Sequence, residues 1–272
     1  MRLSVSHITR YTYASPVRQV TQSMRLTPSE HAGLRVIEWS IESEKTTFGQ
    51  MFTDGAGNHV QTLYARNERN SIEIAVRGIV ETTDTGGVLK NHREKIPPTA
   101  YLQKTHTTLA NASIRGLARE TVDAVPESES LERVHRLAHR ISEAITYKYA
   151  STTATTTAAQ AFESGQGVCQ DYAHLLIATC GVVGMPARYV SGYLLASDNL
   201  SPHELTHAWA EVFIPDLGWV GFDPTNRCCP DENYIRLASG LDANQAAPIR
   251  GRSRGKSQET LDVDVAVKSM QQ

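Results

Sequence analysis

The feature that most constrains the fold of this chain is the order of three short segments in its second half. A glycine-rich turn leads into a predicted helix at Cys169, a predicted strand begins at His207, and a second strand ends just before Asp223. Each of these polar side chains stands where an element begins or ends, so regular backbone would hold all three. Any fold of this chain therefore has to place a thiol, an imidazole and a carboxylate at the ends of a helix and a hairpin.

The helix that begins at Cys169 is predicted from its apolar face and its boundaries. Gly165 and Gly167 permit a tight turn before it, and Gly184 marks its end. One face collects Cys169, Tyr172, Ala173, Leu176, Cys180 and Val183. Cys169 then lies in the first turn, where free amides and the helix dipole stabilise a thiolate and could hold an oxyanion. A merely apolar core role fits Cys180 better than Cys169.

A hairpin is predicted after this helix. Large or polar residues alternate with small or apolar ones in a strand pattern at His207, Trp209, Glu211 and Phe213. Residues 215–218 predict a turn and residues 219–222 the partner strand. Asp223 stands at its end because Pro224 cannot continue a central ladder. Antiparallel pairing would bring Asp223 near His207, where its carboxylate could orient the ring and stabilise the imidazolium.

A thiol, an imidazole and a carboxylate in this order are the parts of an activated sulfur nucleophile. Cys169 would attack an amide carbonyl, His207 would pass a proton to the leaving amine, and Asp223 would orient the ring. Water or a second amine would then cleave the thioester. The residues predict a cysteine-dependent hydrolase or acyltransferase for a peptide, isopeptide or other amide-containing substrate, with no cofactor. Singly, each residue has an ordinary alternative role in the core or in a turn.

Four ordered blocks of the second half resemble the bacterial transglutaminase-like superfamily, whose members are often described as candidate cysteine proteases. The blocks are Gly167–His174, Gly184–Tyr193, His207–Val212 and Gly218–Thr225. The resemblance implies a papain-like α+β core with Cys169 as nucleophile, His207 as base and Asp223 as orienting group. It favours hydrolysis over transamidation, because the family label describes a fold more than a reaction.

The first 85 residues are predicted to form a small antiparallel β-sandwich. Alternating or β-branched residues predict strands over Leu3–Thr12, Arg18–Leu26, Arg35–Ile41, His59–Tyr64 and Ser71–Ile79. This half also resembles the N-terminal β domain that commonly precedes the core in bacteria, through segments that include Thr9–Tyr13, Arg25–Pro28 and Asp54–Asn58. Residues 86–98 have the composition of a linker, which leaves residues 99–272 for the core.

Within the core, helices are predicted over Thr99–Ala124, Leu131–Tyr147 and Ala158–Glu163, and a buried strand over Arg188–Leu195. A strand that closes the core is predicted near the end of the chain, because apolar residues alternate with polar ones at Leu261, Val263, Val265 and Val267. Gln166, Trp209 and Tyr193 could line the cleft or assist the oxyanion hole, although packing roles would also explain them.

Two other functions compete with the thiol enzyme. His203-Glu204-Leu205-Thr206-His207 matches the H-E-x-x-H pattern of zinc peptidases. The loop before it and the strand pattern after it leave at most one helical turn, so no metal site is expected. A binding or scaffold protein could also keep the fold without catalysis, but such a protein has no physical need for all of Cys169, His207 and Asp223.

Composition sets the outer bounds. The chain has 272 residues, enough for one large domain or two modest ones, and a net charge of −2. With a pI of about 6.6, it gives no electrostatic reason to expect nucleic acid or an anionic membrane as a partner. Four cysteines without framework spacing, and no apolar leader or spanning segment, predict a cytoplasmic protein. Adjacent Cys228 and Cys229 are expected as free thiols.

Overall fold

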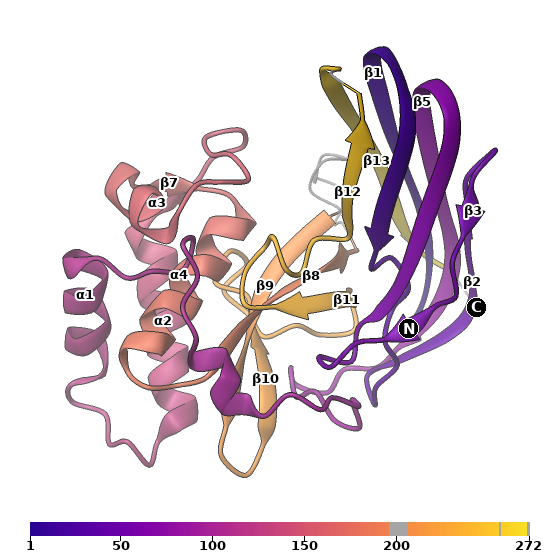
Figure 1. Ribbon diagram of the computed structural model, residues 1–272. Coiled ribbons are helices and arrows are strands. Elements are labelled where there is room, and N and C mark those ends of the chain that lie inside the picture. Colours follow the sequence, from indigo (N-terminus) through magenta and orange to yellow (C-terminus); the bar gives the residue numbers. More distant parts are fainter. Residues whose placement is uncertain (196–205, 256, 271–272) are drawn as a thin grey trace.

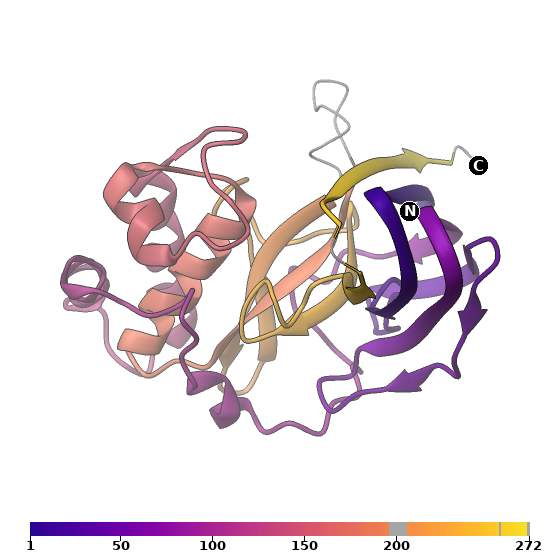
Figure 2. The ribbon, with the colours of Figure 1, turned by 45° about the horizontal axis from the view of Figure 1, so that its top comes forward.

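The computed structural model describes residues 1–195, 206–255 and 257–270. The elements form three layers, with helices on one side, a four-stranded sheet in the middle and a long curved sheet on the other side (Figures 1 and 2). This arrangement confirms the predicted α+β class with an antiparallel N-terminal β domain. We refer to the long curved sheet as the β domain and to the other two layers as the core.

The β domain is built around two very long strands, β1 (Arg2–Met24) and β5 (His59–Thr82), which pair antiparallel. The sequence predicted two shorter strands in place of each. The register of the pairing shifts between Thr12 and Val17, in a segment that contains Pro16. A bulge can hold a proline and bends a strand without ending it. The sheet therefore continues through the bend, and its two halves fold together around one apolar cluster.

Five shorter strands complete this seven-stranded sheet. Three of them pair with β5: β2 (Leu34–Glu42), β3 (Thr47–Phe48) and β4 (Phe52–Thr53). Two pair with the other edge of β1: β12 (Ile249–Arg254) and β13 (Glu259–Ser269). The central β1–β5 ladder is thus covered on both edges.

The C-terminal strand differs from the prediction in its place. It was expected to close the core, but β13 pairs with β1 from Leu3 to Tyr13 and so belongs to the sheet of the β domain. Its alternating apolar residues explain this position. Val265 and Val267 are buried in the same cluster as Leu3 and as Tyr193 of the core. The strand therefore lies in the β domain while its apolar face packs on the core.

The core consists of an antiparallel sheet with the order β10-β9-β8-β11 and a helical layer on one face (Figure 1). The strands are β8 (Ala187–Leu194), β9 (Thr206–Ile214), β10 (Gly218–Phe222) and β11 (Tyr234–Gly240). The helices are α1 (Ala112–Val122), α2 (Ser130–Ala144), α3 (Ala158–Ser164) and α4 (Cys169–Val182). Two short strands pair in parallel, β6 (Thr146–Tyr147) and β7 (Gln166–Gly167). None of the helices in the described ranges combines the length and apolarity that crossing a membrane requires.

The helix predicted over Thr99–Ala124 is interrupted. A 3-10 turn, η1, covers Pro98–Leu102, and α1 begins only at Ala112. The cause is Asn111, whose Oδ1 accepts a hydrogen bond from the Ile114 amide at 2.9 Å. An asparagine side chain competes with helical backbone pairing and favours the capping position over a helix interior. The apolar periodicity therefore extends N-terminal to Ala112, the first residue of the helix.

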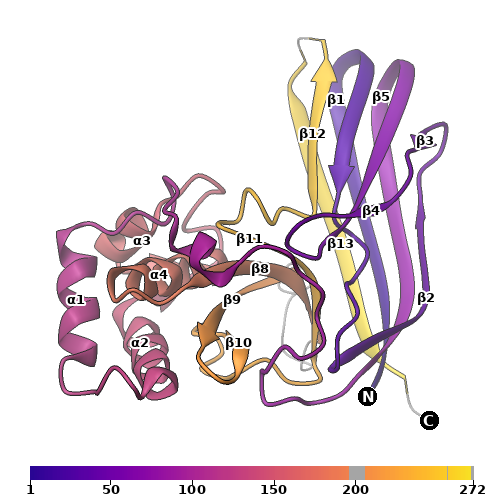
Figure 3. The ribbon, with the colours of Figure 1, turned by 60° about the horizontal axis from the view of Figure 1, so that its bottom comes forward.

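Residues 86–98, predicted as a linker, pack against both parts of the molecule. The Leu89 amide donates to the carbonyl of Trp219 at 2.9 Å, so the segment runs beside β10. Figures 1 and 3 show this course from β5 past the central sheet toward the helices. On the other side, His92 Nε2 lies 3.1 Å from the carbonyl of Ala56 in the β domain. The segment thus fastens the two parts together instead of separating them.

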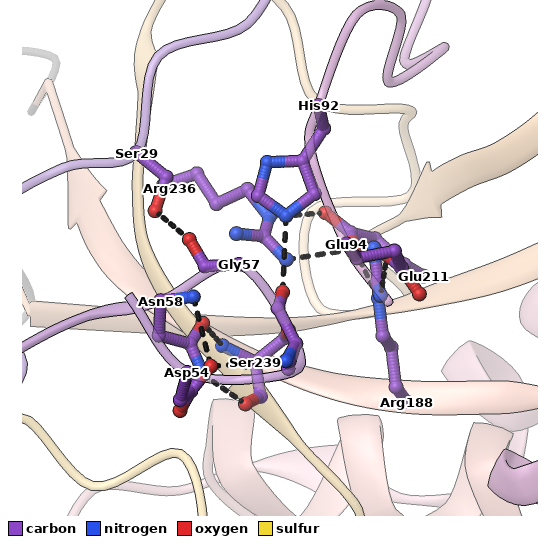
Figure 4. Close-up of polar contacts among 11 residues, drawn as sticks. Ser29, Asp54, Gly57, Asn58, His92, Glu94, Arg188, Glu211, Arg236 and Ser239 are labelled. Carbon is purple, nitrogen blue, oxygen red and sulfur yellow. Dashed lines mark hydrogen bonds and ion pairs between the residues drawn. The ribbon is translucent and has the colours of Figure 1, made fainter. Parts of the chain in front are cut away.

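The turn between β4 and β5 forms a second attachment (Figure 4). Asn58 is 1% exposed. Its Nδ2 donates to the carbonyl of Ser239 in β11 at 2.9 Å, and the Ser239 amide donates back to Oδ1 at 2.8 Å. Asp54 holds the turn closed by accepting from the Asn58 amide at 3.0 Å. Because these groups are buried and paired, they fix the β domain firmly against the core.

Candidate active site

Cys169 is the first residue of α4 and is partly exposed. Gly165 ends α3 with a left-handed backbone, φ 66°, which lets the chain reverse within a few residues. Asp171 then caps α4, because its Oδ2 accepts from the Val168 amide at 2.8 Å. The amides of Cys169 and Gln170 stand in the first turn, where no preceding helical carbonyl can pair with them. These donors and the helix dipole favour negative charge at the sulfur or beside it.

His207 and Asp223 meet where the predicted hairpin would bring them. His207 is the second residue of β9, and Asp223 follows the last residue of β10. His207 Nε2 lies 2.6 Å from Asp223 Oδ2, and the two residues are 8% and 1% exposed. Because Nε2 is taken by the carboxylate, Nδ1 is the ring nitrogen left for the thiol.

The histidine ring also contacts the cysteine. Burial alone would lower the pKa of His207, but hydrogen bonds to Asp223 and Cys169, and the charges on both, raise it to about 10. An imidazole held in its charged form beside a thiol is the partner that a thiolate requires. The structure therefore places the sulfur of α4 beside the ring of β9, and that ring is hydrogen-bonded to the carboxylate after β10.

Two residues that the sequence did not identify complete the surroundings of Asp223. Tyr234 in β11 donates to Oδ2 at 2.8 Å, and Asn226 Nδ2 donates to the same oxygen at 2.8 Å. Oδ1 accepts from the amides of Thr225 and Asn226 at 2.9 and 3.2 Å. Burial would raise the pKa of Asp223, but the hydrogen bonds from His207, Tyr234 and Asn226 lower it. Asn226 follows Asp223 in the turn after β10, whereas no local signal marks Tyr234.

The cysteines near this site are free thiols, as predicted for Cys228 and Cys229. Cys228 Sγ lies 3.3 Å from Tyr234 Oη, which donates its own hydrogen to Asp223. Cys180 is completely buried within α4, and burial raises the pKa of its thiol. Its environment fits the apolar role that the sequence assigned to it.

The three supporting residues named from the sequence lie outside the described lining of the cleft beside Cys169. Trp209 is buried, with its ring centroid 6.4 Å from that of His207 and 5.5 Å from that of Tyr234. Tyr193 is buried and bonds to His7 Nδ1 at 2.8 Å through its hydroxyl. Gln166 belongs to β7, beside β6. Trp209 therefore packs near the ring of His207, and Tyr193 holds His7, which lines the cleft.

The close packing of Trp209 depends on a glycine. Gly192 stands opposite His207 in the β8–β9 register. A Cβ atom built there would lie 2.6 Å from the Trp209 ring and 2.2 Å from the carbonyl of Ile235. Both distances are shorter than van der Waals contact, so no larger residue fits without moving the strands that carry His207.

A cleft of about 670 Å³ opens beside Cys169 and His207. Its lining comes from both parts of the molecule. The core contributes the reactive groups and Asn226, and β1 and β13 contribute residues that include Tyr11 and Leu261. A concave, mostly apolar site with a few converging polar groups is the usual form of a substrate site.

The H-E-x-x-H segment lies only partly within the described residues. His203, Glu204 and Leu205 lie outside the described residues, and His207 is the second residue of β9 and is hydrogen-bonded to Asp223. Among the residues that the structure describes, no group of three or more His, Cys, Asp or Glu side chains is arranged to hold a metal ion.

Comparison with known proteins identifies relatives along the whole chain. An uncharacterized protein of Mycobacterium leprae is 27% identical over 98% of both chains. A protein-glutamine gamma-glutamyltransferase of Pseudomonas aeruginosa is 33% identical over 87 residues, which make up 30% of this chain and 12% of that protein. The crystal structure of a proposed cysteine protease from Cytophaga hutchinsonii superposes with a TM-score of 0.76 at 21% identity. That match covers 100% of this chain and 92% of the other, and shows a common fold.

Family models cover most of the chain. Residues 3–81 match the bacterial transglutaminase-like N-terminal region, and residues 115–224 match the transglutaminase-like superfamily. The second range contains Cys169, His207 and Asp223. The chain therefore has a papain-like core of the transglutaminase-like superfamily, preceded by a bacterial transglutaminase-like N-terminal domain.

Proposed function

We propose that this protein is a cysteine-dependent amide hydrolase that acts on peptide or isopeptide bonds through a thioester on Cys169. The observation that carries the proposal is the position of His207, hydrogen-bonded to Asp223 on one side and adjoining Cys169 on the other, at the edge of a cleft. A protein that only binds would gain nothing from a buried carboxylate that keeps this imidazole charged.

The reaction begins with attack of the Cys169 sulfur on the carbonyl carbon of the substrate. A carbon–sulfur bond forms and the carbonyl electrons move to oxygen, which the first-turn amides of Cys169 and Gln170 can stabilise. The carbon–nitrogen bond then breaks while the imidazolium of His207 gives its proton to the leaving amine. This yields the thioester, the free amine and a neutral imidazole.

Water completes the cycle. The neutral ring of His207 takes a proton from the water as its oxygen attacks the thioester, and the carbon–sulfur bond breaks. The products are a carboxylic acid and the regenerated thiolate–imidazolium pair. An amine that replaced this water would give transamidation instead, and the test below separates the two outcomes.

A substrate screen tests the proposal. Peptide, isopeptide and glutamine-amide substrates are incubated with the wild type and with Cys169→Ala, and the products are identified by mass spectrometry. Cys229→Ala is the matched control, because Cys229 is also partly exposed but lies outside the cleft lining. We expect hydrolysis by the wild type and by the control variant, and none by Cys169→Ala. Amine incorporation in place of hydrolysis would assign transfer as the main reaction.

Alkylation tests the state of the thiol independently of any substrate. Iodoacetamide at mildly acidic pH should label Cys169 quickly, because a thiolate paired with imidazolium reacts where an ordinary thiol stays protonated. Labelling of Cys229 in the same sample provides the internal comparison. Equal slow labelling of both cysteines would favour the scaffold alternative and would argue against a catalytic Cys169.

A further inference from the structure

One wall of the cleft is formed by the β domain. Residues of β1 and β13 stand opposite each other in the register, with Tyr11 beside Leu261 and Thr9 beside Val263. Side chains at alternate positions point to the same face of a sheet, so all four project to one side. Ile249 of β12 adds to them, and all five line the cleft that contains Cys169. We call Thr9, Tyr11, Ile249, Leu261 and Val263 the β-domain wall.

The same face of β13 packs on the core at one end and is open at the other. Val265 and Val267 are buried against the core, with exposures of 2% and 6%. Leu261, four residues before Val265 on the same face, is 58% exposed. The apolar side chains of β13 thus continue beyond the part of the strand that the core covers, and Leu261 lines the cleft as an exposed side chain. An exposed large apolar side chain that lines the same cleft as Cys169 is available for contact with a substrate.

Apart from the Cys169–His207 pair, the described residues that line the cleft offer no charged side chain to compensate a charged group at this wall. Among the described residues that line it, none is Asp, Glu, Lys or Arg. His7, next to the wall, has both ring nitrogens engaged, Nδ1 with the Tyr193 hydroxyl and Nε2 with Thr9 Oγ1, each at 2.8 Å. Burial lowers the pKa of His7 to about 4, so it is neutral near pH 7. A charged group placed here would lose hydration without gaining a partner.

We propose that the β-domain wall is a specificity subsite that accepts an apolar side chain next to the reactive amide and disfavours a charged one. This inference rests on the proposed function, because it assumes that a substrate lies across Cys169. It assigns a role to the β domain as well, since β1, β12 and β13 supply the whole wall. Substrate preference would thus come from one part of the molecule and bond cleavage from the other.

Three matched probes test the subsite: the iodoacetyl derivatives of leucine amide, aspartate amide and glycine amide. In each, the sulfur of Cys169 displaces iodide, so a carbon–sulfur bond forms as the carbon–iodine bond breaks. The probes differ only in the side chain beside the reacting group. We expect the leucine probe to alkylate the wild type about tenfold or more faster than the aspartate probe, within the usual range for one apolar contact. Intact-protein and peptide mass spectrometry measure the rates at Cys169.

Leu261→Asp removes the apolar contact at an exposed position where folding should not depend on the side chain. Leu217→Asp is the matched control, because Leu217 is 44% exposed and comes after the last residue of β9, whereas His207 lies near the first. Leu261→Asp should slow the leucine probe about tenfold and leave the glycine probe and iodoacetamide unchanged. Leu217→Asp should change none of these rates.

Equal rates for the leucine and aspartate probes in the wild type, or an unchanged ratio in Leu261→Asp, would overturn the subsite. Failure of the proposed function has a different signature. In that case Cys169 reacts with iodoacetamide no faster than Cys229, while the ratio of the leucine to the aspartate rate still reports on the wall. The two conclusions are therefore decided by separate measurements.

Discussion

Replacing Glu211 by glutamine should destabilise this protein much more than the same change at Glu81, although each carboxylate is held by two arginines. Glu211 lies in β9 and is 3% exposed. It accepts from Arg188 Nε at 2.6 Å and from Arg236 Nε and Nη2 at 2.8 and 3.3 Å (Figure 4). Glu94 also pairs with Arg188, so this buried group holds two positive and two negative charges.

The magnitude follows from what the substitution leaves behind. Without the charge of Glu211, the group keeps two buried guanidinium groups and the single carboxylate of Glu94, which pairs with Arg188, so its net charge is +1 and Arg236 loses its carboxylate partner. Removing one member of a buried ion pair typically costs about 3–5 kcal/mol, because the remaining charge is uncompensated. For a chain of this size such a loss lowers the melting temperature by on the order of 10 °C. Stacking of Arg188 on Trp219, at 3.9 Å from the ring centroid, is present in the wild type as well and does not offset the loss.

Urea and thermal unfolding of the wild type, Glu211→Gln and Glu81→Gln measure the effect. Glu81 pairs with Arg2 and Arg35 at the surface, where solvent screens the charges, so its variant should lose little stability. Burial would raise the pKa of Glu211, but the charges of Arg236 and Arg188 hold it well below its ordinary range. The difference in the free energy of unfolding between Glu211→Gln and the wild type should therefore be largest near neutral pH and decrease only below about pH 4. Equal losses in both variants would refute the reasoning.

Three further predictions concern the site and the attachment of the β domain. Asp223→Asn should lower kcat/KM roughly 100-fold or more, because a neutral amide cannot balance the imidazolium; a loss below about tenfold would contradict the orienting role. The pKa of His207 is raised from 6.5 to about 10, so its stabilising effect is complete below about pH 6.5 and is lost as the pH rises through 10. Urea unfolding between about pH 6 and pH 10 should show a steeper decline in the wild type than in His207→Gln, and parallel curves would exclude this coupling. Asn58→Ala should lower the free energy of unfolding by about 2–4 kcal/mol, because it strands the buried amide and carbonyl of Ser239; a thermal unfolding curve unchanged from the wild type would contradict the attachment.

The parts of the fold that could be predicted from the sequence are those determined by residues close together in the chain. The helix from Cys169 and the hairpin from His207 each carry their own period and boundary residues, so their positions follow from short segments. The meeting of His207 with Asp223 also has a local cause, since a hairpin joins them. The core elements closest to the site were therefore the most predictable.

The parts that could not be predicted depend on distant pairing or on competing local effects. Nothing near Tyr234 indicates that β11 will bring its hydroxyl to Asp223. The continuous course of β1 through Pro16 depends on a bulge that β5 completes from the facing strand. Pairing of β13 with β1 joins segments about as far apart as the chain allows, and the alternating pattern alone specifies a face but not a partner.

The pairing of β1 with β13 also has a consequence for biosynthesis. Leu3 pairs with Ser269 and Tyr13 with Glu259, so β1 leaves the ribosome long before its partner strand β13. Until then, one long edge of β1 remains open to pairing with other chains, and contacts of such separation form slowly. Leu261 and Val263 reach the cleft only when that strand docks. A nascent chain could therefore bring Cys169 and His207 together before β13 docks on β1 and completes the β-domain wall.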